Sequence, residues 1–298
     1  MLNPNADPHR NTWCRRARHI AALLDQRMQP VQFRALAIDL DGTLLVGEDV
    51  PAENVRALRA AIAAGYQVVI ATARWQQIAI DVAAQVGFSA PIVACSGAQV
   101  HLPDSNTNLY DVRLPEAFVD ALYNICDSER CVATVTIEND VLLKLDGEPN
   151  LASLPAGLTW VRALNSRRES LPRVAAIQGS KANQRIRDEL QLQFQDSVNF
   201  YDSIGPNGKT ILTLTHKRAD KGVALKIALA HIGVTPEQTV AFGDAENDIQ
   251  MFRVAGASVA MGQADEHVKS NATFVTLANT QCGVAHAIDR LLAGGQLN

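Results

Sequence analysis

The sequence has no excess of positive charge and no long apolar run. Its 298 residues include 27 Lys and Arg against 31 Asp and Glu, for a formal net charge of -4 at pH 7. This balance gives no bulk attraction to nucleic acid or to an anionic membrane, so we expect neither as a partner. The apolar piece Ile20 to Leu24 is far too short to span a membrane and lacks the features of a secretory signal. We therefore expect a cytoplasmic protein, either a monomer or a homodimer.

Cysteine is scarce and scattered. The five cysteines are Cys14, Cys95, Cys126, Cys131 and Cys282. Their odd number and the absence of paired spacing argue against a disulfide framework and a structural zinc site, and favour reduced thiols. The sequence also lacks an internal repeat or a long heptad run, which argues against a solenoid or a coiled coil.

Apolar runs and helical spacing alternate from residue 35 onward. The chain is 47% hydrophobic and 19% charged, as expected of a globular protein with one large domain or two ordinary ones. The pattern predicts strands at 35–38, 67–72 and 91–96, with helices at 51–64 and 75–86 between them. This order with short connections is typical of a Rossmann-like, doubly wound parallel sheet in an α/β fold.

The alternation changes near residue 108. The predicted elements there are a helix at 115–126, a hairpin of strands at 132–137 and 141–145, strands near 173–178, 198–201 and 210–215, and a helix at 182–194. The α/β alternation then resumes with a helix at 221–231, strands at 239–242 and 258–261, and a helix at 248–255. The sequence thus predicts an N-terminal extension at 1–32, core segments at 33–107 and 215–298, and an α+β insert at 108–214.

Two carboxylates follow the first predicted strand. Asp39 and Asp41 come directly after the apolar run Ala35 to Ile38, and Gly42 then allows a sharp turn. Because side chains alternate along a strand, we expect both carboxylates on the same side of its carboxyl end, where open α/β sheets bind ligands. Such a pair could hold a hard metal ion, divide the roles of nucleophile and acid, or only cap the turn.

Polar residues also follow two other predicted strands. Thr72 and Arg74 come after the second strand, where the hydroxyl could bind phosphate oxygens or cap the next helix. Asp244, Asn247 and Asp248 follow a later strand. Asp244 could ligate a metal, Asn247 could donate to phosphate, and Asp248 could support the ligands, although Asp and Asn also cap helices.

Lys221 begins a predicted helix, where a cation is unfavourable for the helix dipole unless an anion compensates it. The ammonium could neutralise a nucleophilic carboxylate and a phosphate together, and a solvated surface lysine is the simpler alternative. The order of these four polar segments, each at a strand or helix end, is unlikely for capping residues alone.

Together the segments resemble the haloacid dehalogenase superfamily, specifically the Cof-like phosphatases with a large α/β cap. The resemblance runs from Leu36 to Leu292 through the motifs IDLDGTLL, VVIATAR, DKGVALK, GDAENDIQMF and VAMGQADEHVK. It implies Mg2+-dependent hydrolysis of small phosphorylated metabolites through an aspartyl-phosphate, with sugar phosphates first and nucleotide or cofactor phosphates second.

The resemblance also implies a role for each matching residue. Asp39 would be the nucleophile, and Asp41 the acid that protonates the leaving alcohol and then activates water. The implied catalytic residues are Asp39, Asp41, Thr72 and Lys221, and the implied phosphate-binding residues are Leu40, Thr43, Thr72, Ala73, Lys221 and Asn247. The implied Mg2+ ligands are Asp39, the backbone carbonyl of Asp41, and Asp244, with Asp248 in support.

The chain departs from the family pattern in two loops and leaves other functions open. Ser96 stands where such proteins often have Asn, and Gln263 stands where Asn often follows Met-Gly. A phosphotransferase or phosphomutase using the same aspartyl-phosphate, and a non-catalytic sensor of phosphorylated metabolites, remain alternatives. The insert is expected to set substrate choice, with Arg167 and Lys181 as candidate contacts, while His216 is more readily a hinge residue than a substrate contact.

Overall fold

The computed structural model describes residues 33–149, 157–204 and 208–294. The chain divides into two units, residues 1–32 and 33–298, and the extension predicted for 1–32 lies outside the described residues. No helix within the described ranges is long and apolar enough to cross a membrane.

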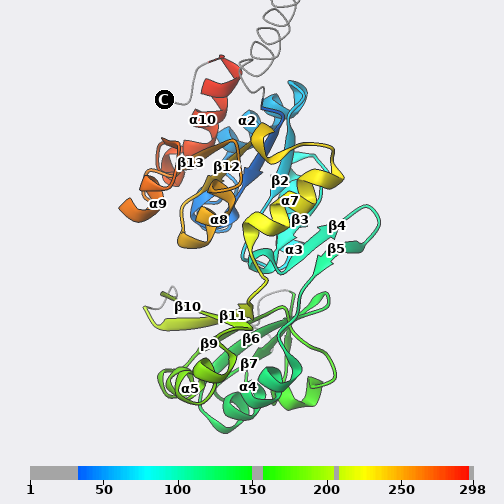
Figure 1. Cartoon of the computed structure of the whole chain (residues 1–298), viewed down its shortest axis with the longest axis vertical. Helices are drawn as coiled ribbons and strands as arrows, with labels where there is room; N and C mark the ends of the chain where they lie inside the picture. Colours follow the sequence, from blue (N-terminus) through cyan, green and yellow to red (C-terminus); the bar gives the residue numbers. More distant parts are fainter. Residues whose placement is uncertain (1–32, 150–156, 205–207, 295–298) are drawn as a thin grey trace, which may run out of the picture. The chain divides into compact units, whose positions relative to one another are not determined.

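A five-stranded parallel sheet has the strand order β14-β13-β12-β1-β2 (Figure 1). Its strands are β1 (Ala35–Ile38), β2 (Gln67–Ile70), β12 (Thr239–Gly243), β13 (Ala257–Ala260) and β14 (Phe274–Val275). β1 lies between β12 and β2, with Ile38 level with both Phe242 and Ile70. The register therefore brings the carboxyl ends of β1 and β12 side by side, although about two hundred residues separate them in the sequence.

Helices cover both faces of this sheet, as the sequence predicted. They are α2 (Ala52–Ala63), α3 (Gln76–Val86), α7 (Lys221–His231), α8 (Ile249–Phe252), α9 (Glu266–Ser270) and α10 (Gly283–Leu292). Side chains alternate along β1, so Leu36 and Ile38 pack with α2, α3 and α10, while Ala35 and Ala37 pack with α7 and α8. Burial on both faces explains why β1 reads as a continuous apolar run.

The third predicted strand belongs to a different sheet from the one expected. β3 (Ile92–Ala94) makes a single parallel bridge to the end of β2, between Val93 and Ala71, and then pairs antiparallel with β4 (Gln99–Leu102). β4 pairs in turn with β5 (Thr107–Asp111). The sequence does not predict this hairpin, because its turn, which ends at Asn106 with φ 51°, falls where the predicted alternation of strands and helices changes.

The insert folds around a six-stranded sheet in the order β10-β11-β9-β6-β7-β8. Its elements are α4 (Glu116–Ser128), β6 (Val132–Ile137), β7 (Asp140–Lys144), β8 (Leu158–Trp160), β9 (Val174–Gln178), α5 (Ser180–Ile186), α6 (Leu192–Phe194), β10 (Val198–Ile204) and β11 (Thr210–His216). The pairs are antiparallel except β7 with β8, a three-residue strand that the sequence did not indicate. A separate hydrophobic cluster fills the space between this sheet and α4 and α5 (Figure 1).

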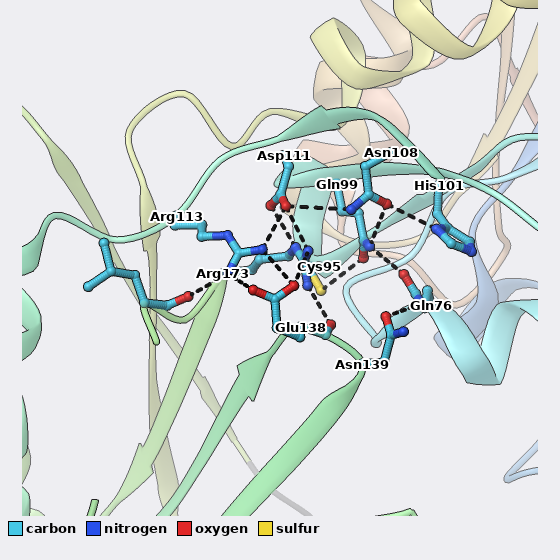
Figure 2. A network of polar contacts seen from close by, with 11 residues as sticks. Gln76, Cys95, Gln99, His101, Asn108, Asp111, Arg113, Glu138, Asn139 and Arg173 are labelled. Atoms are coloured by element: carbon cyan, nitrogen blue, oxygen red, sulfur yellow. Dashed lines mark hydrogen bonds and ion pairs between the residues drawn. The ribbon is translucent and has the colours of Figure 1, made fainter. Parts of the chain in front are cut away.

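A buried arginine joins the insert to the segment that leads into it. Arg173 is 1% exposed, and its guanidinium donates to both carboxylate oxygens of Asp111 at 2.8 Å and to the backbone carbonyl of Glu138 at 2.5 Å. Arg113 binds the side chains of Asp111 and Glu138 as well (Figure 2). A buried charge is costly unless it is paired. This cluster therefore holds the segment between β5 and α4, which we call the first linker, against the start of β9.

His216 lies in the second linker, where the chain returns from β11 to α7. Its Nδ1 accepts a hydrogen bond from the backbone amide of Arg218 at 2.9 Å, and burial lowers the pKa of the imidazole. The carbonyl of Arg218 also accepts a hydrogen bond from the Tyr110 hydroxyl at 3.0 Å. A hinge or surface role for His216 stays a prediction, and the described contacts hold its ring against the backbone of the return segment.

Candidate active site

Asp39 and Lys221 meet at the carboxyl end of β1. Lys221 is 0% exposed, and its Nζ donates to Asp39 Oδ1 at 2.6 Å and to Asp248 Oδ1 at 2.7 Å. Asp220 caps the start of α7 by accepting from the amide of Val223. The cation that looked unfavourable at a helix start is therefore compensated by two buried carboxylates.

Asp39, Asp244 and Asp248 form a compact acidic cluster. Each offers one oxygen, and these oxygens lie within 4.8 Å of one another. Asp248 is fully engaged, because Oδ1 accepts from Lys221 while Oδ2 accepts from the amides of Asp244 and Ala245, both at 3.0 Å. Asp39 and Asp244 each keep an oxygen for another partner, so they are the better candidates for metal ligands, with Asp248 positioning the loop.

The charges of this cluster fit a hard divalent cation. Burial and the nearby Asp248 raise the pKa of Asp39 well above its usual range, and Lys221 only partly offsets them. Burial, followed by Asp248, raises the pKa of Asp244 to about 6. Three acids therefore share one lysine, and an oxygen-only donor set with uncompensated negative charge is what Mg2+ binds.

Asp244→Asn should stabilise the metal-free protein at neutral pH. The pKa of Asp244, about 6 against the ordinary 3.8, means that its stabilising contribution is full below pH 3.8 and is lost as the pH rises through 6. In EDTA at pH 7.5, we expect the melting temperature of Asp244→Asn to equal or exceed that of the native protein. The pKa difference corresponds to a gain of up to about 3 kcal/mol in the free energy of unfolding. Mg2+ should raise the melting temperature of the native protein and not that of the variant.

The control for this melting experiment is Asp49→Asn, which changes an exposed carboxylate between the Leu40–Leu44 turn and α2. That variant should keep the pH dependence and the Mg2+ response of the native protein. Equal stabilisation of Asp244→Asn and the native protein by Mg2+ would contradict the placement of Asp244 in the metal site.

The turn after β1 fits closely against Asp244. Gly42 has φ +75°, and a Cβ added there would lie 2.1 Å from Asp244 Oδ2, so only glycine suits this position. The hydroxyl of Thr43 donates to Asp244 Oδ1 at 3.2 Å, and both Leu40 and Thr43 are buried. Leu40 can offer a ligand only its backbone amide, whereas Thr43 orients a proposed metal ligand.

Asp41 does not join the buried carboxylates. Its side chain is 50% exposed, and the guanidinium of Arg74 holds it with Nη2 at 2.6 Å and Nε at 2.9 Å. Arg74 also binds Glu48 at 2.5 Å. The strand ends at Ile38 and the tight turn begins at Leu40, so strand alternation does not fix the direction of the Asp41 side chain relative to Asp39. Arg74 is the last residue of the motif VVIATAR, but nothing in the sequence pairs it with Asp41.

Thr72, Ala73 and Asn247 surround the same end of the sheet. Thr72 is buried, and its Oγ1 accepts from the amide of Arg74 at 3.0 Å, which leaves the hydroxyl proton for a ligand. Ala73 is exposed and could contribute only its amide. The half-buried side chain of Asn247 makes no hydrogen bond to any residue that the structure describes, so its amide group remains available.

Gln263 and Ser96, the two residues at which the chain departs from the family pattern, lie in loops beside the site. Gln263 donates from Nε2 to the carbonyl of Gly42 at 2.6 Å and accepts from the amide of Asn279 at 3.0 Å, so it ties the turn after β1 to a neighbouring loop. Ser96 has φ 56°, in the left-handed region where Asn is tolerated better than most residues. Gly97, at φ +85°, packs so close to the Asp220 backbone that a Cβ would lie 2.4 Å from its carbonyl carbon.

Several basic residues of the insert form ion pairs with its own acidic residues or are buried within it. Ion pairs join Arg130 to Asp146, Arg162 to Glu148, Arg168 to Asp120 and Lys181 to Glu129. Lys144 is buried, with Nζ 3.4 Å from the carbonyl of Cys131. Arg167 ends a short turn beside α4. A substrate contact by Arg167 or Lys181 stays a prediction, and for Lys181 it would compete with the ion pair to Glu129.

Comparison with known proteins gives a consistent result. A family model described as haloacid dehalogenase-like hydrolase matches residues 36–288. The 5-amino-6-(5-phospho-D-ribitylamino)uracil phosphatase YwtE of Bacillus subtilis (strain 168) is 30% identical over 292 residues, covering 88% of this chain and 99% of that protein. A phosphoglycolate phosphatase of Methanothermobacter thermautotrophicus is 28% identical over 260 residues, with 87% and 99% covered.

Solved structures agree with these relatives. The crystal structure of a haloacid dehalogenase-like hydrolase from Bacteroides thetaiotaomicron is 25% identical, with a TM-score of 0.76, and covers 87% of this chain and 100% of that chain. The resemblance inferred from the motifs is thus confirmed over the core and the insert together. The chain belongs to the haloacid dehalogenase-like hydrolase family and is a phosphatase.

Proposed function

We propose that this chain is a Mg2+-dependent phosphatase of small phosphorylated metabolites that acts through an aspartyl-phosphate on Asp39. Sugar and polyol phosphates are the first substrate class, and nucleotide or cofactor phosphates are the second. The observation that carries the proposal is the Asp39 carboxylate, which is bound by Lys221 on one oxygen and lies within 4.8 Å of Asp244. The relatives named as phosphatases of a ribityl phosphate and of phosphoglycolate support a small substrate.

The proposed roles follow from the side chains. Asp39 attacks phosphorus with the oxygen that Lys221 does not bind, and Lys221 balances the charge that gathers there. Thr72, Asn247 and the amides of Leu40 and Ala73 orient the phosphoryl oxygens. Mg2+, held by Asp39, the Asp41 carbonyl and Asp244, would supply charge neutralisation at the phosphoryl group.

Asp41 completes the proposed chemistry. Its carboxyl group protonates the leaving alcohol, and the resulting carboxylate then takes a proton from the water that hydrolyses the aspartyl-phosphate. To reach the leaving oxygen, the side chain has to exchange its contact with Arg74 for one with the substrate. Its exposed position makes that exchange inexpensive.

We further propose that residues 108–214 form the cap and that residues 33–107 and 215–298 form the catalytic core. The insert has its own hydrophobic cluster, centred on Phe118, Leu122 and Leu214, which supports a separate folding unit. All the proposed catalytic residues lie outside it. The core would then supply the chemistry and the cap the substrate contacts.

A phosphate-release assay tests the function. The purified chain is incubated with p-nitrophenyl phosphate and a panel of metabolite phosphates in Mg2+, and again after EDTA treatment and dialysis. We expect release of inorganic phosphate with Mg2+ and at least about a hundredfold loss without it. Phosphoryl movement between sugar positions would indicate a mutase, and tight binding without turnover would indicate a sensor. Full activity without metal would exclude the Mg2+ site.

A further inference from the structure

The insert sheet has two chemically different faces. One face packs against α4 and α5 through residues such as Val135, Ile177 and Leu214, which are buried. Of the residues that alternate with them, Thr134, Ala176 and Thr213 are partly buried, whereas Val141, Leu143, Asn199 and Thr215 are buried. We call this second side the open face of the insert sheet.

The strand register arranges the open face into cross-strand rows. In the first row Leu143 lies opposite Thr134, which lies opposite Ala176, then Thr213, and finally Tyr201 on β10. Residues directly opposite on antiparallel strands place their side chains on the same face, so these five are neighbours in order.

A second row runs alongside, nearer the linkers. It consists of Val141, Thr136, Val174, Thr215 and Asn199. Val174 packs against the hydrophobic cluster of the parallel sheet domain. Asn199 donates to the hydroxyl of Thr215 at 3.3 Å.

Neither row contains a charged residue. The hydroxyls of Thr134, Thr213 and Tyr201 make no hydrogen bond to another residue within the described parts of the chain. The open face therefore offers neutral donors and acceptors between small apolar side chains. The basic residues of the insert lie elsewhere, as the ion pairs on its helical layer show.

Contacts to the catalytic segments connect the open face to the active site. On β10, at one edge of the insert sheet, burial together with the carboxylates of Asp220 and Glu246 raises the pKa of Tyr201. At the other edge of the insert, a Cβ on Gly157 would lie 2.8 Å from the Trp75 ring, close to the Thr72 loop.

A second contact at that edge points the same way. The side chain of Gln76 donates to Asn139, in the turn between β6 and β7, at 2.7 Å (Figure 2). Gln76 begins α3, directly after the loop that carries Thr72 and Arg74. The insert thus contacts Trp75 and Gln76, which directly follow the loop that carries Thr72 and Arg74.

We propose that Thr213 and Tyr201, in the first row of the open face, are specificity-determining residues that favour a neutral polyhydroxyl leaving group over one with a second anionic group. The proposal rests on the proposed phosphatase function. Free hydroxyls can exchange hydrogen bonds with the hydroxyls of a sugar or polyol. A second phosphate would lose water at a face whose two rows hold no cation, so its binding is disfavoured.

The test compares kcat/KM for three substrates, all in Mg2+: p-nitrophenyl phosphate, ribitol 5-phosphate and fructose 1,6-bisphosphate. We expect the native protein to prefer the polyol monophosphate over the bisphosphate by at least about tenfold. Thr213→Val and Tyr201→Phe should each lower kcat/KM for ribitol 5-phosphate about three- to tenfold, mainly through KM, and change p-nitrophenyl phosphate less than about twofold.

A gain of function gives the sharper result. Thr213→Lys adds a cation to the first row and should raise the ratio of bisphosphate to monophosphate kcat/KM by about tenfold or more. Thr107→Val, on the exposed strand β5, is the matched control and should change none of these ratios. Circular dichroism melting identifies any variant that fails to fold. Thr213→Ser and Thr134→Val are then measured in place of the variants that fail.

The outcomes separate this inference from the proposed function. No turnover of p-nitrophenyl phosphate by the native protein would refute the phosphatase function itself. Turnover with a native preference for the bisphosphate, or with substrate ratios unchanged in all the row variants, would overturn the role of the open face and leave the catalytic assignment standing.

Discussion

Asp39→Asn is expected to lower turnover by about a thousandfold or more, because the side-chain amide is a poor nucleophile and a poor Mg2+ ligand. The substitution is nearly isosteric at a buried position where Lys221 Nζ lies 2.6 Å from one oxygen. It also removes one of three acids that compete for a single lysine, so it should not unfold the protein. Burial already raises the pKa of Asp39, and a neutral group at this position relieves that strain.

The measurements are phosphate release with p-nitrophenyl phosphate and the melting temperature in EDTA. The melting temperature of Asp39→Asn should equal or exceed that of the native protein. Asp81→Asn, which changes an exposed carboxylate on α3, serves as the control and should retain full activity. Activity of Asp39→Asn within tenfold of the native level, after mass spectrometry excludes deamidation, would rule out Asp39 as the nucleophile.

Lys221→Met should abolish activity and destabilise the protein together. Lys221 is the buried cation that binds both Asp39 and Asp248, and Met matches its length without its charge. Burial alone would lower the pKa of Lys221, but Asp248 and Asp39 raise it above its usual value. Its contribution to stability is therefore complete at neutral pH and is lost only when the pH rises through that elevated pKa. Removing one partner of a buried ion pair costs about 3–5 kcal/mol.

The pH dependence distinguishes this effect from a simple packing defect. Without the lysine, which lowers the pKa of Asp39, that carboxyl group should hold its proton more tightly in the folded state, so the loss of stability should be smaller at pH 5 than at pH 8. Mg2+ should recover part of the lost stability by supplying positive charge. Lys226→Met, on the exposed side of the same helix, should leave activity and melting unchanged. A pH-independent loss in Lys221→Met would argue against the charge network as its cause.

The sequence alone determined the local elements and the identity of the chemistry-bearing segments. The apolar run of β1, the glycine after α3 and the helix from Lys221 to His231 appear where the sequence predicts them, because each depends on contacts within a few residues. The motif order likewise led to the family before any geometry was known. The roles of the individual site residues remain proposals.

Only the tertiary structure decided which polar groups meet. Sheet order and register place β12 beside β1, and that pairing brings Asp244 and Asp248 to Asp39 across about two hundred residues. Local spacing gave no sign that Arg74, 33 residues further along the chain, would bind the Asp41 carboxylate. The neutral open face of the insert also depends on register across five strands. These features were not predictable because sequence periodicity reports the face of one element, while partners across a sheet are chosen by long-range packing.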